Sequence, residues 1–351
     1  MSKQQQQQQQ QQVGFIGLGN MGSLMSTNLA TWLHSQSYPR LMLWNRTRSK
    51  LPSEQSNHVQ HAESIQHLVT NCDIVFTSLA NDEVAQSVYN EMFKHVETKS
   101  SKTCFVETST LFPTTSGQLE RQASKLDNVY FCQAPVFGPP PMAEQAKLVW
   151  ILSGDVVARK WVEPFLVPSM GRKVLDVGSN VEKASAFKLN GNFMVLGMIE
   201  LLAEGLTLAE KTGVGSELMM TFINEFMPAP SAIGYGNKMV SNHFQGETGF
   251  TVEGGLKDAK HLQQLASNVN ATVPVIDVAH RHLITARALG FQNKDWSVLV
   301  AGPRQAAGLS ALTGKIPTPH DTGFGFKTDG DDGDPKLEPV RDGEIKKVQN
   351  W

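Results

Sequence analysis

The stretch VGFIGLGNMGSLMSTNLA, residues 13 to 30, decides the fold. A short apolar run leads into glycines at positions 17, 19 and 22, and helix-compatible residues follow. Gly17 permits a sharp turn, Gly19 lets the backbone approach a pyrophosphate, and Gly22 lets the helix lie close to the strand. The phosphates would face the first N–H groups of the helix, where its dipole favours negative charge. The residues expected to contact a dinucleotide here are Gly17, Leu18, Gly19, Asn20, Met21 and Gly22.

The length, net charge and cysteine pattern limit the class of protein that the sequence can encode. A chain of 351 residues is long enough for two ordinary domains. The net charge is −2 and there is no basic tract, so we expect neither nucleic acid nor an anionic membrane as a partner. Three scattered cysteines without a C-x-x-C pair indicate reduced thiols in a cytoplasmic protein. Glutamines stand where a signal peptide would need apolar residues, and glutamates interrupt the longest apolar segment, so neither secretion nor membrane spanning is expected.

Low-complexity segments flank the part of the chain that is expected to fold. Residues 1–12 are largely glutamine and residues 313–351 are rich in Pro, Gly and Asp, so both are expected to be disordered tails. After the first strand, further apolar runs alternate with helical patterns. This alternation predicts a mainly parallel sheet with helices on both faces, a Rossmann-type α/β dinucleotide-binding domain over residues 13–178. The further expected strands are 41–44, 73–79, 103–107, 129–132, 148–154 and 173–178.

The pattern changes after residue 178, and an all-α helical domain is expected over residues 179–312. From Glu182 to Thr212 the chain has no proline and is apolar on most faces. A helix that is apolar nearly all round is a buried one. We therefore expect the central helix of a second domain or of a subunit interface, and with it a homo-oligomer.

The residues after the second expected strand bear on the choice of nucleotide. A unit of this kind that prefers NAD usually ends this strand in Asp or Glu, which binds the ribose 2′-OH. Here the strand runs into Asn45, Arg46 and Thr47. Arg46 can pair with a 2′-phosphate through its planar fork, and Thr47 can donate a hydroxyl. NADP is therefore favoured and NAD stays possible; the alternative is a solvated basic turn.

A lysine stands within the long apolar helical segment. In FKLNGN, Lys188 and Asn192 are four residues apart, so their side chains project from the same face of a helix. Burying an unpaired ammonium is costly, so such a lysine is expected to line a cleft. The alternative is a lysine whose stem is buried while its ammonium reaches the surface.

Several segments, in order along the chain, carry a family resemblance. FIGLGNMGSLMSTNL resembles the N-terminal signature of the β-hydroxyacid dehydrogenase family, which includes 3-hydroxyisobutyrate dehydrogenase and is related to 6-phosphogluconate dehydrogenase. ETSTLFP is similar to the family's substrate-binding segment, and APVFGPPPMAEQAKL to the loop that follows it. FKLNGN resembles its catalytic helix, and GLKDAKHLQQLA its late cofactor-contacting helix. The similarity covers Val13 to about Leu289.

The resemblance implies an NADP-dependent oxidoreductase that moves hydride between the nicotinamide and a β-hydroxy acid or related carbonyl substrate. It implies Lys188 as the catalytic proton donor and acceptor, with Asn192 beside it binding substrate. A cation placed where an alkoxide develops would stabilise the transition state, in agreement with this role. The other residues that the resemblance implies are Leu79, Thr110 and Lys257 for the cofactor, and Ser109, Phe137 and Gly138 for the substrate.

One departure from the family's pattern bears on the substrate. The family usually has Ser-Gly-Gly after Ala-Pro-Val, where hydroxyl and backbone donors hold the substrate carboxylate, but this chain has Phe137, Gly138 and Pro139. Phe137 brings no donor and Pro139 lacks an N–H. We therefore expect an altered grip on a carboxylate, which leaves the identity of the substrate open.

Two other interpretations stay open. An imine reductase resembles this family but generally carries a different residue where Lys188 stands, while Phe137 would suit a bulkier, less acidic substrate. A non-catalytic scaffold that keeps the nucleotide fold would have lost the lysine, whereas Lys188, Asn192 and Thr110 are present here. The ten histidines show no H-E-x-x-H spacing, so no metal site is expected.

Overall fold

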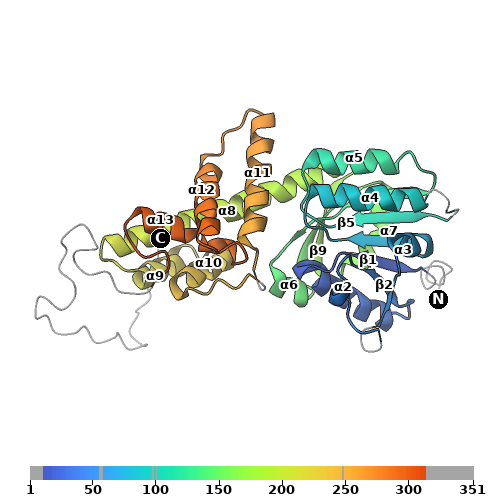
Figure 1. Ribbon diagram of the computed structural model, residues 1–351, viewed down its shortest axis with the longest axis horizontal. Coiled ribbons are helices and arrows are strands. Elements are labelled where there is room, and N and C mark those ends of the chain that lie inside the picture. Colours follow the sequence, from blue (N-terminus) through green and yellow to red (C-terminus); the bar gives the residue numbers. More distant parts are fainter. Residues whose placement is uncertain (1–10, 55–57, 97–98, 100, 247–248, 314–351) are drawn as a thin grey trace, which may run out of the picture.

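The chain folds into two bodies joined by one long helix. A computed structural model describes residues 11–54, 58–96, 99, 101–246 and 249–313. Figure 1 shows a sheet with helices on both faces beside a cluster of helices, with helix α8 running from the first body through the second. The disorder expected for residues 1–10 and 314–351 falls outside the described residues.

The described part of the first body holds a nine-stranded sheet. Its strands are β1 (Val13–Ile16), β2 (Leu41–Trp44), β3 (Val59–His61), β4 (Ile74–Thr77), β5 (Thr103–Glu107), β6 (Val129–Gln133), β7 (Val136–Phe137), β8 (Leu148–Gly154) and β9 (Gly171–Gly178). The order is β3-β2-β1-β4-β5-β6-β8-β7, and β9 pairs with β8. All pairings from β3 across to β6 are parallel, whereas β8 runs antiparallel to β6 and β7. The prediction of a mainly parallel sheet is confirmed.

Helices cover both faces of this sheet (Figure 1). They are α2 (Asn20–Ser35), α3 (Ile65–Asn71), α4 (Asp82–Val96), α5 (Pro113–Ala123), α6 (Pro140–Glu144) and α7 (Val156–Leu166), with a 3-10 turn η1 (Arg48–Lys50). The carboxylate of Asp155 caps α7 by accepting from the N–H groups of Val157 and Ala158. Pro113 and Pro140 open α5 and α6, where the missing N–H breaks no helical hydrogen bond.

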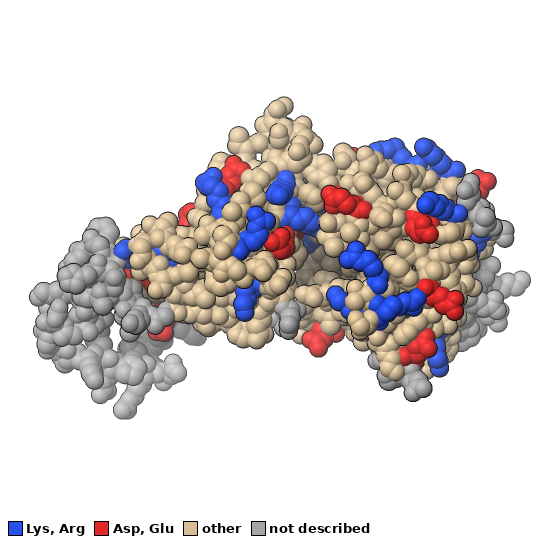
Figure 2. Space-filling view, viewed as in Figure 1, with Lys and Arg blue, Asp and Glu red and all other residues tan. Residues whose placement is uncertain are grey.

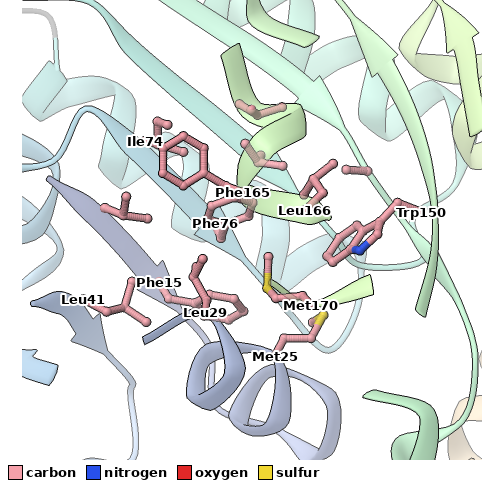
Figure 3. Packing of buried hydrophobic residues seen from close by; sticks show 14 of the residues in the cluster. Phe15, Met25, Leu29, Leu41, Ile74, Phe76, Trp150, Phe165, Leu166 and Met170 are labelled. Carbon is pink, nitrogen blue, oxygen red and sulfur yellow. The ribbon is translucent and has the colours of Figure 1, made fainter. Parts of the chain in front are cut away.

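Successive strand residues point to opposite faces, and both faces are buried. Phe15 of β1 and Phe76 of β4 pack with α2 and α7, whereas Ile16 and Val75 pack with α3, α4 and α5. Figure 3 shows the first of these clusters, in which Phe15, Phe76 and Phe165 lie together. Because neither face meets water, the central strands read as continuous apolar runs, which is why the sequence predicts them.

The shortest strands escape prediction. β3 (VQH) has three residues and β7 (VF) has two, and neither forms an apolar run long enough to be recognised. The strand expected at 73–79 is limited to Ile74–Thr77. Its last expected residues instead form the loop after β4, which is where Leu79 lies.

The second body is built from helices. Asn180 caps α8 (Val181–Lys211) by accepting from the N–H of Glu182 at 2.9 Å. The other elements are α9 (Ser216–Phe226), α10 (Pro230–Ser241), α11 (Val252–Asn268), α12 (Pro274–Ala288), η2 (Trp296–Val300) and α13 (Ala301–Ala306). Leu189 and Leu196 of α8 pack in one core with Leu256 of α11 and Leu283 of α12. The expected all-α part after the sheet is confirmed.

By length and composition alone, α8 could cross a membrane. Half of its most apolar 18-residue window is buried inside the protein, 50%. Its buried carboxylates are also paired within the second body: Glu200 lies 2.6 Å from His282, and Glu210 is hydrogen-bonded to Arg304. These contacts identify α8 as the core helix of the second body.

Two residues assigned to the tails belong to the fold instead. The Gln12 carbonyl accepts from the N–H of Asp73 at 2.8 Å, because β1 and β4 are neighbours and their pairing extends one residue outward. At the other end, the N–H of Thr313 donates to Asn242 at 3.0 Å. Gln12 and Thr313 therefore belong to the folded part of the chain.

The glycine turn after β1 gives a prediction about stability. Gly17 has φ +97°, and a Cβ there would lie 2.1 Å from the Ser78 carbonyl oxygen; a Cβ on Gly22 would lie 2.0 Å from the Gly17 carbonyl oxygen. No atom lies within 4 Å of a Cβ placed on Gly19. Alanine at either crowded position should therefore cost about 1–3 kcal/mol of unfolding free energy in a denaturant titration. Gly19→Ala, the matched control, should leave it unchanged, and equal losses at all three positions would contradict this account.

Candidate functional site

Four loops meet at the carboxyl edge of the parallel strands. Gly17 follows β1, Asn45 follows β2, Leu79 comes after β4, and Ser109 comes after β5. In open α/β sheets, ligands bind outside this edge. The sheet therefore gathers residues from segments far apart in the sequence.

The glycine turn is shaped to accept a group at the start of α2. Gly17 and Gly22 have no room for a side chain, whereas the space above Gly19 is open. No side chain caps α2, and its first backbone hydrogen bond runs from the N–H of Ser23 to the carbonyl of Gly19. The N–H groups of residues 19–22 can therefore meet an anion, as a dinucleotide pyrophosphate requires. Met21 packs its side chain against the core, so it can contribute only its backbone here.

Of the residues after β2, Asn45 is buried and holds the glycine turn in place, whereas Arg46 and Thr47 form an exposed rim. Asn45 is buried, accepts from the N–H of Leu18 at 2.9 Å and donates to the carbonyl of Thr47 at 2.8 Å. It therefore fixes the glycine turn against the end of β2. Arg46 and the Thr47 side chain are exposed beside it, where a ribose phosphate could meet them.

The loops after β4 and β5 are tied together by Ser109. Its hydroxyl accepts from the N–H of Leu79 at 2.6 Å, and the Leu79 side chain lies near Gly17. Gln133 of β6 donates to the Ser109 carbonyl at 3.1 Å. The structure thus brings Ser109 and Leu79 next to the glycine turn.

A buried carboxyl group supports Ser109 from below. Glu107 accepts from the Ser109 N–H at 2.6 Å and from the Thr77 hydroxyl at 2.8 Å. Burial raises the pKa of Glu107 to about 7, although the hydrogen bonds from Ser109 and Thr77 act against it. No sequence pattern singled out Glu107, because it lies within an ordinary apolar strand.

A second polar cluster approaches from the helical body. The Lys257 ammonium of α11 donates to the Thr110 carbonyl at 2.8 Å and lies 3.3 Å from the Asp258 carboxylate. Asn192 of α8 donates to the other oxygen of Asp258, which is fully buried. The helices therefore place Asn192 and Lys257 on one side of the cleft and hold them through Asp258.

Lys188 belongs to this cluster. Burial lowers the pKa of Lys188 to about 8, Asp258 acts to raise it, and Lys257 acts to lower it further. Asp258 accepts from Asn192 with one oxygen and lies beside the Lys257 ammonium with the other, and its attraction for Lys188 offsets the desolvation only in part. Lys188 is partly exposed on α8 and lies near Asp258 and Lys257, both of which act on its pKa.

Phe137, the last residue of β7, lies against Lys188. The Lys188 Nζ is 4.7 Å from the centre of the Phe137 ring, a cation–π contact. Gly138 follows with φ +137° and is packed against Leu148. Because Gly138 has no side chain, Phe137 alone of this pair contacts the lysine.

The two bodies also meet beside the cleft. His261 of α11 lies 3.3 Å from Asp82, and the Phe112 N–H donates to Asp82 at 2.9 Å. Burial acts to raise the pKa of Asp82, but hydrogen bonds, the largest from His261, hold this pKa at about 2. Asn20 makes a longer contact, 3.4 Å, with the Gly246 carbonyl. Figure 2 shows a hollow between the bodies with Lys and Arg side chains on both sides.

Among the residues that the structure describes, no group of three or more His, Cys, Asp or Glu side chains is placed to hold a metal ion.

Two protein families match the chain. Residues 12–178 match the family described as the NAD binding domain of 6-phosphogluconate dehydrogenase. Residues 183–301 match the family described as the NAD-binding domain of NADP-dependent 3-hydroxyisobutyrate dehydrogenase. The two matches divide the chain where β9 ends and α8 begins.

Curated relatives match over most of their length. An oxidoreductase of Bacillus subtilis, YfjR, is 28% identical over 82% of this chain and 98% of its own. Glyoxylate/succinic semialdehyde reductase 2 of Arabidopsis thaliana is 27% identical over 85% and 81%. The mitochondrial 3-hydroxyisobutyrate dehydrogenase of Drosophila melanogaster is 26% identical over 82% and 87%.

Solved structures share the fold. The 3-hydroxyisobutyrate dehydrogenase of Mycobacterium tuberculosis with L-serine has a TM-score of 0.70 at 23% identity, covering 84% of this chain and 99% of that one. Psf3 in complex with NADP+ and 2-OPP has a TM-score of 0.71 at 19% identity, covering 83% and 99%. An imine reductase of Myxococcus stipitatus with NADP+ has a TM-score of 0.55 at 18% identity, covering 82% and 98%.

Proposed function

We propose that the protein transfers hydride between NADP and a β-hydroxy acid or related carbonyl substrate, because the chain belongs to the β-hydroxyacid dehydrogenase family. As a member of this family it is an NAD(P)-dependent oxidoreductase. The observation that carries the proposal is the Lys188 ammonium, which lies over the Phe137 ring and whose pKa burial lowers to about 8.

The cleft residues have separate tasks in this proposal. The bound nicotinamide supplies or takes up the hydride. Lys188 donates a proton to the substrate oxygen in reduction and accepts it in oxidation, and a pKa near the working pH suits both directions. Asn192, oriented by its hydrogen bond to Asp258, binds the substrate one helical turn from Lys188. Lys257 anchors the Thr110 segment, so that Thr110 and Leu79 line the path of the cofactor.

The preference for NADP rests on the rim after β2. Arg46 is exposed beside the glycine turn and can form a bidentate pair with a 2′-phosphate. Asn45 occupies the end of the strand with an uncharged amide, so no carboxylate repels that phosphate. We therefore assign Arg46 and Thr47 to the 2′-phosphate of NADP, with Gly17 to Gly22 around the pyrophosphate.

A second candidate, imine reduction, is favoured by Phe137 alone. Its ring places an apolar surface beside Lys188, as a bulkier and less acidic substrate would need. The lysine itself fits a carbonyl oxygen better, because it can give a proton to a developing alkoxide. An NADPH oxidation assay with matched carbonyl and imine substrates would separate the two functions, and a non-catalytic scaffold would turn over neither.

Replacing the lysine tests the catalytic assignment. Lys188→Met keeps the apolar stem and removes the charge, so kcat should fall by roughly 10²-fold or more while NADPH affinity and melting temperature stay close to the parent values. Lys183→Met, an exposed lysine on the same helix, is the matched control and should leave kcat unchanged. Full turnover by Lys188→Met would refute the assignment.

The pH profile gives the same test an independent readout. The ammonium is the proton donor, so kcat/KM for carbonyl reduction should be highest below pH 8 and fall as the pH rises through the Lys188 pKa of about 8. The reverse oxidation needs the neutral amine and should rise over the same range. Both inflections should be absent from any residual activity of Lys188→Met.

The nucleotide assignment is tested by a charge reversal. Arg46→Asp places a carboxylate against the 2′-phosphate, so it should abolish or invert the expected preference for NADPH over NADH in fluorescence titrations. Arg40→Asp makes the same change of charge at the opposite end of β2 and should preserve the preference. Equal affinities of the parent protein for both nucleotides would overturn the NADP assignment.

We also propose a cytoplasmic homo-oligomer assembled along α8. Met194, Leu201 and Leu208 recur every seven residues and are 69%, 59% and 63% exposed, which leaves an apolar stripe on one helix face. Such a stripe fits burial against a second copy. Sedimentation should give a dimer or larger assembly at micromolar concentration, which Leu201→Glu should weaken; a parent that sediments as a monomer would contradict the proposal.

A further inference from the structure

The Phe137 ring occupies a fixed place on α8 between Lys188 and Asn192. A Cβ placed on Gly191 would lie only 2.3 Å from two atoms of this ring, so the ring rests directly on the helix backbone. Phe187 meets it edge-on, with ring centres 5.8 Å apart. The ring is therefore held by three neighbouring positions of α8, one of them the lysine itself.

The loop after Phe137 offers few hydrogen-bond donors. Positions 139, 140 and 141 are prolines and carry no N–H. The next two N–H groups, those of Met142 and Ala143, both donate to the Pro139 carbonyl. Residues 139–143 therefore have no backbone N–H left for an anion, and the Phe137 side chain adds no hydrogen-bond donor.

A carboxylate and an apolar group would meet this wall differently. The face of an aromatic ring carries negative charge density, so a carboxylate against it would lose water without gaining a hydrogen bond. An alkyl or aryl group would bury apolar surface on the same ring. The ring leaves Lys188 able to approach a carbonyl oxygen, because a cation is attracted to the ring face and remains a donor.

We infer that Phe137 is the specificity-determining residue of this site, and that it selects carbonyl substrates whose reacting carbon carries an apolar substituent in preference to a carboxylate-bearing one. This inference rests on the proposed hydride transfer and names its substrate class. The ring discriminates by contact with the substituent, while Lys188 acts on the carbonyl oxygen in either case.

Two aldehydes of matched shape test the inference. Succinic semialdehyde ends in a carboxylate, and 4-methylpentanal replaces that carboxylate with an isopropyl group. With NADPH, the parent should show a kcat/KM for 4-methylpentanal at least about tenfold higher, the scale of discrimination by an apolar pocket. Phe137→Ser removes the ring and adds a hydroxyl donor, so it should reverse the ratio. Phe137→Leu keeps an apolar side chain and should retain the parent's preference.

Binding separates a failure of this inference from a failure of the proposed function. The protein saturated with NADP+ would be titrated calorimetrically with 4-methylpentanol and with 4-hydroxybutanoate, which need no turnover. Tighter binding of the neutral alcohol by the parent, lost in Phe137→Ser, would support the role of Phe137 even if neither aldehyde were reduced. The lack of reduction would count against the proposed reaction alone. Tighter binding of the hydroxy acid by the parent, or an unchanged preference in a folded Phe137→Ser variant, would overturn the inference.

Discussion

The hydrogen bond from the Lys257 ammonium to the Thr110 carbonyl joins the helical body to the carboxyl edge of the sheet, and the buried polar cluster beside it is built around the same lysine. Lys257 also lies beside Asp258, and Asp258 holds Asn192. A fully buried carboxylate such as Asp258 is stable only when it is paired and hydrogen-bonded, so removal of either partner would leave a costly charge. The contact between the bodies and the orientation of the Asn192 amide therefore depend on the same carboxylate.

The same arrangement accounts for the state of Lys188. A lysine beside a buried aspartate would ordinarily keep a high pKa, because the ion pair stabilises its charged form. Here burial is the larger influence and the nearby Lys257 ammonium adds to it, so the pKa of Lys188 falls to about 8 although Asp258 acts to raise it.

The sequence predicts what local periodicity and spacing control. The glycine turn, the central strands and the pairing of Lys188 with Asn192 on one face of α8 each lie within a few residues of chain, and each is found in the structure. Glu107 and the acceptor role of Asp258 could not be predicted, because their partners are chosen by topology: Asn192 and Asp258 are 66 residues apart. The short strands β3 and β7 could not be predicted for the same reason, since two or three residues become a strand only when a neighbouring strand is present. The roles of Ser109 and Thr110 came from family resemblance, and the structure adds the bonds that position them.

The departure from the family pattern at Phe137 is accommodated without disturbing either body. The ring needs the space that Gly191 leaves on α8, since any Cβ there would collide with it at 2.3 Å. Gly191 lies between Lys188 and Asn192 in the sequence, so the helix that carries these two polar residues also provides the surface on which the Phe137 ring packs. The loop can then do without donors, because prolines hold its shape without N–H groups and the Met142 and Ala143 N–H groups are satisfied within it. Lys188 and an apolar wall therefore fit on one turn of α8, as they must if the ring is to meet the substituent of the substrate while the lysine acts on its oxygen.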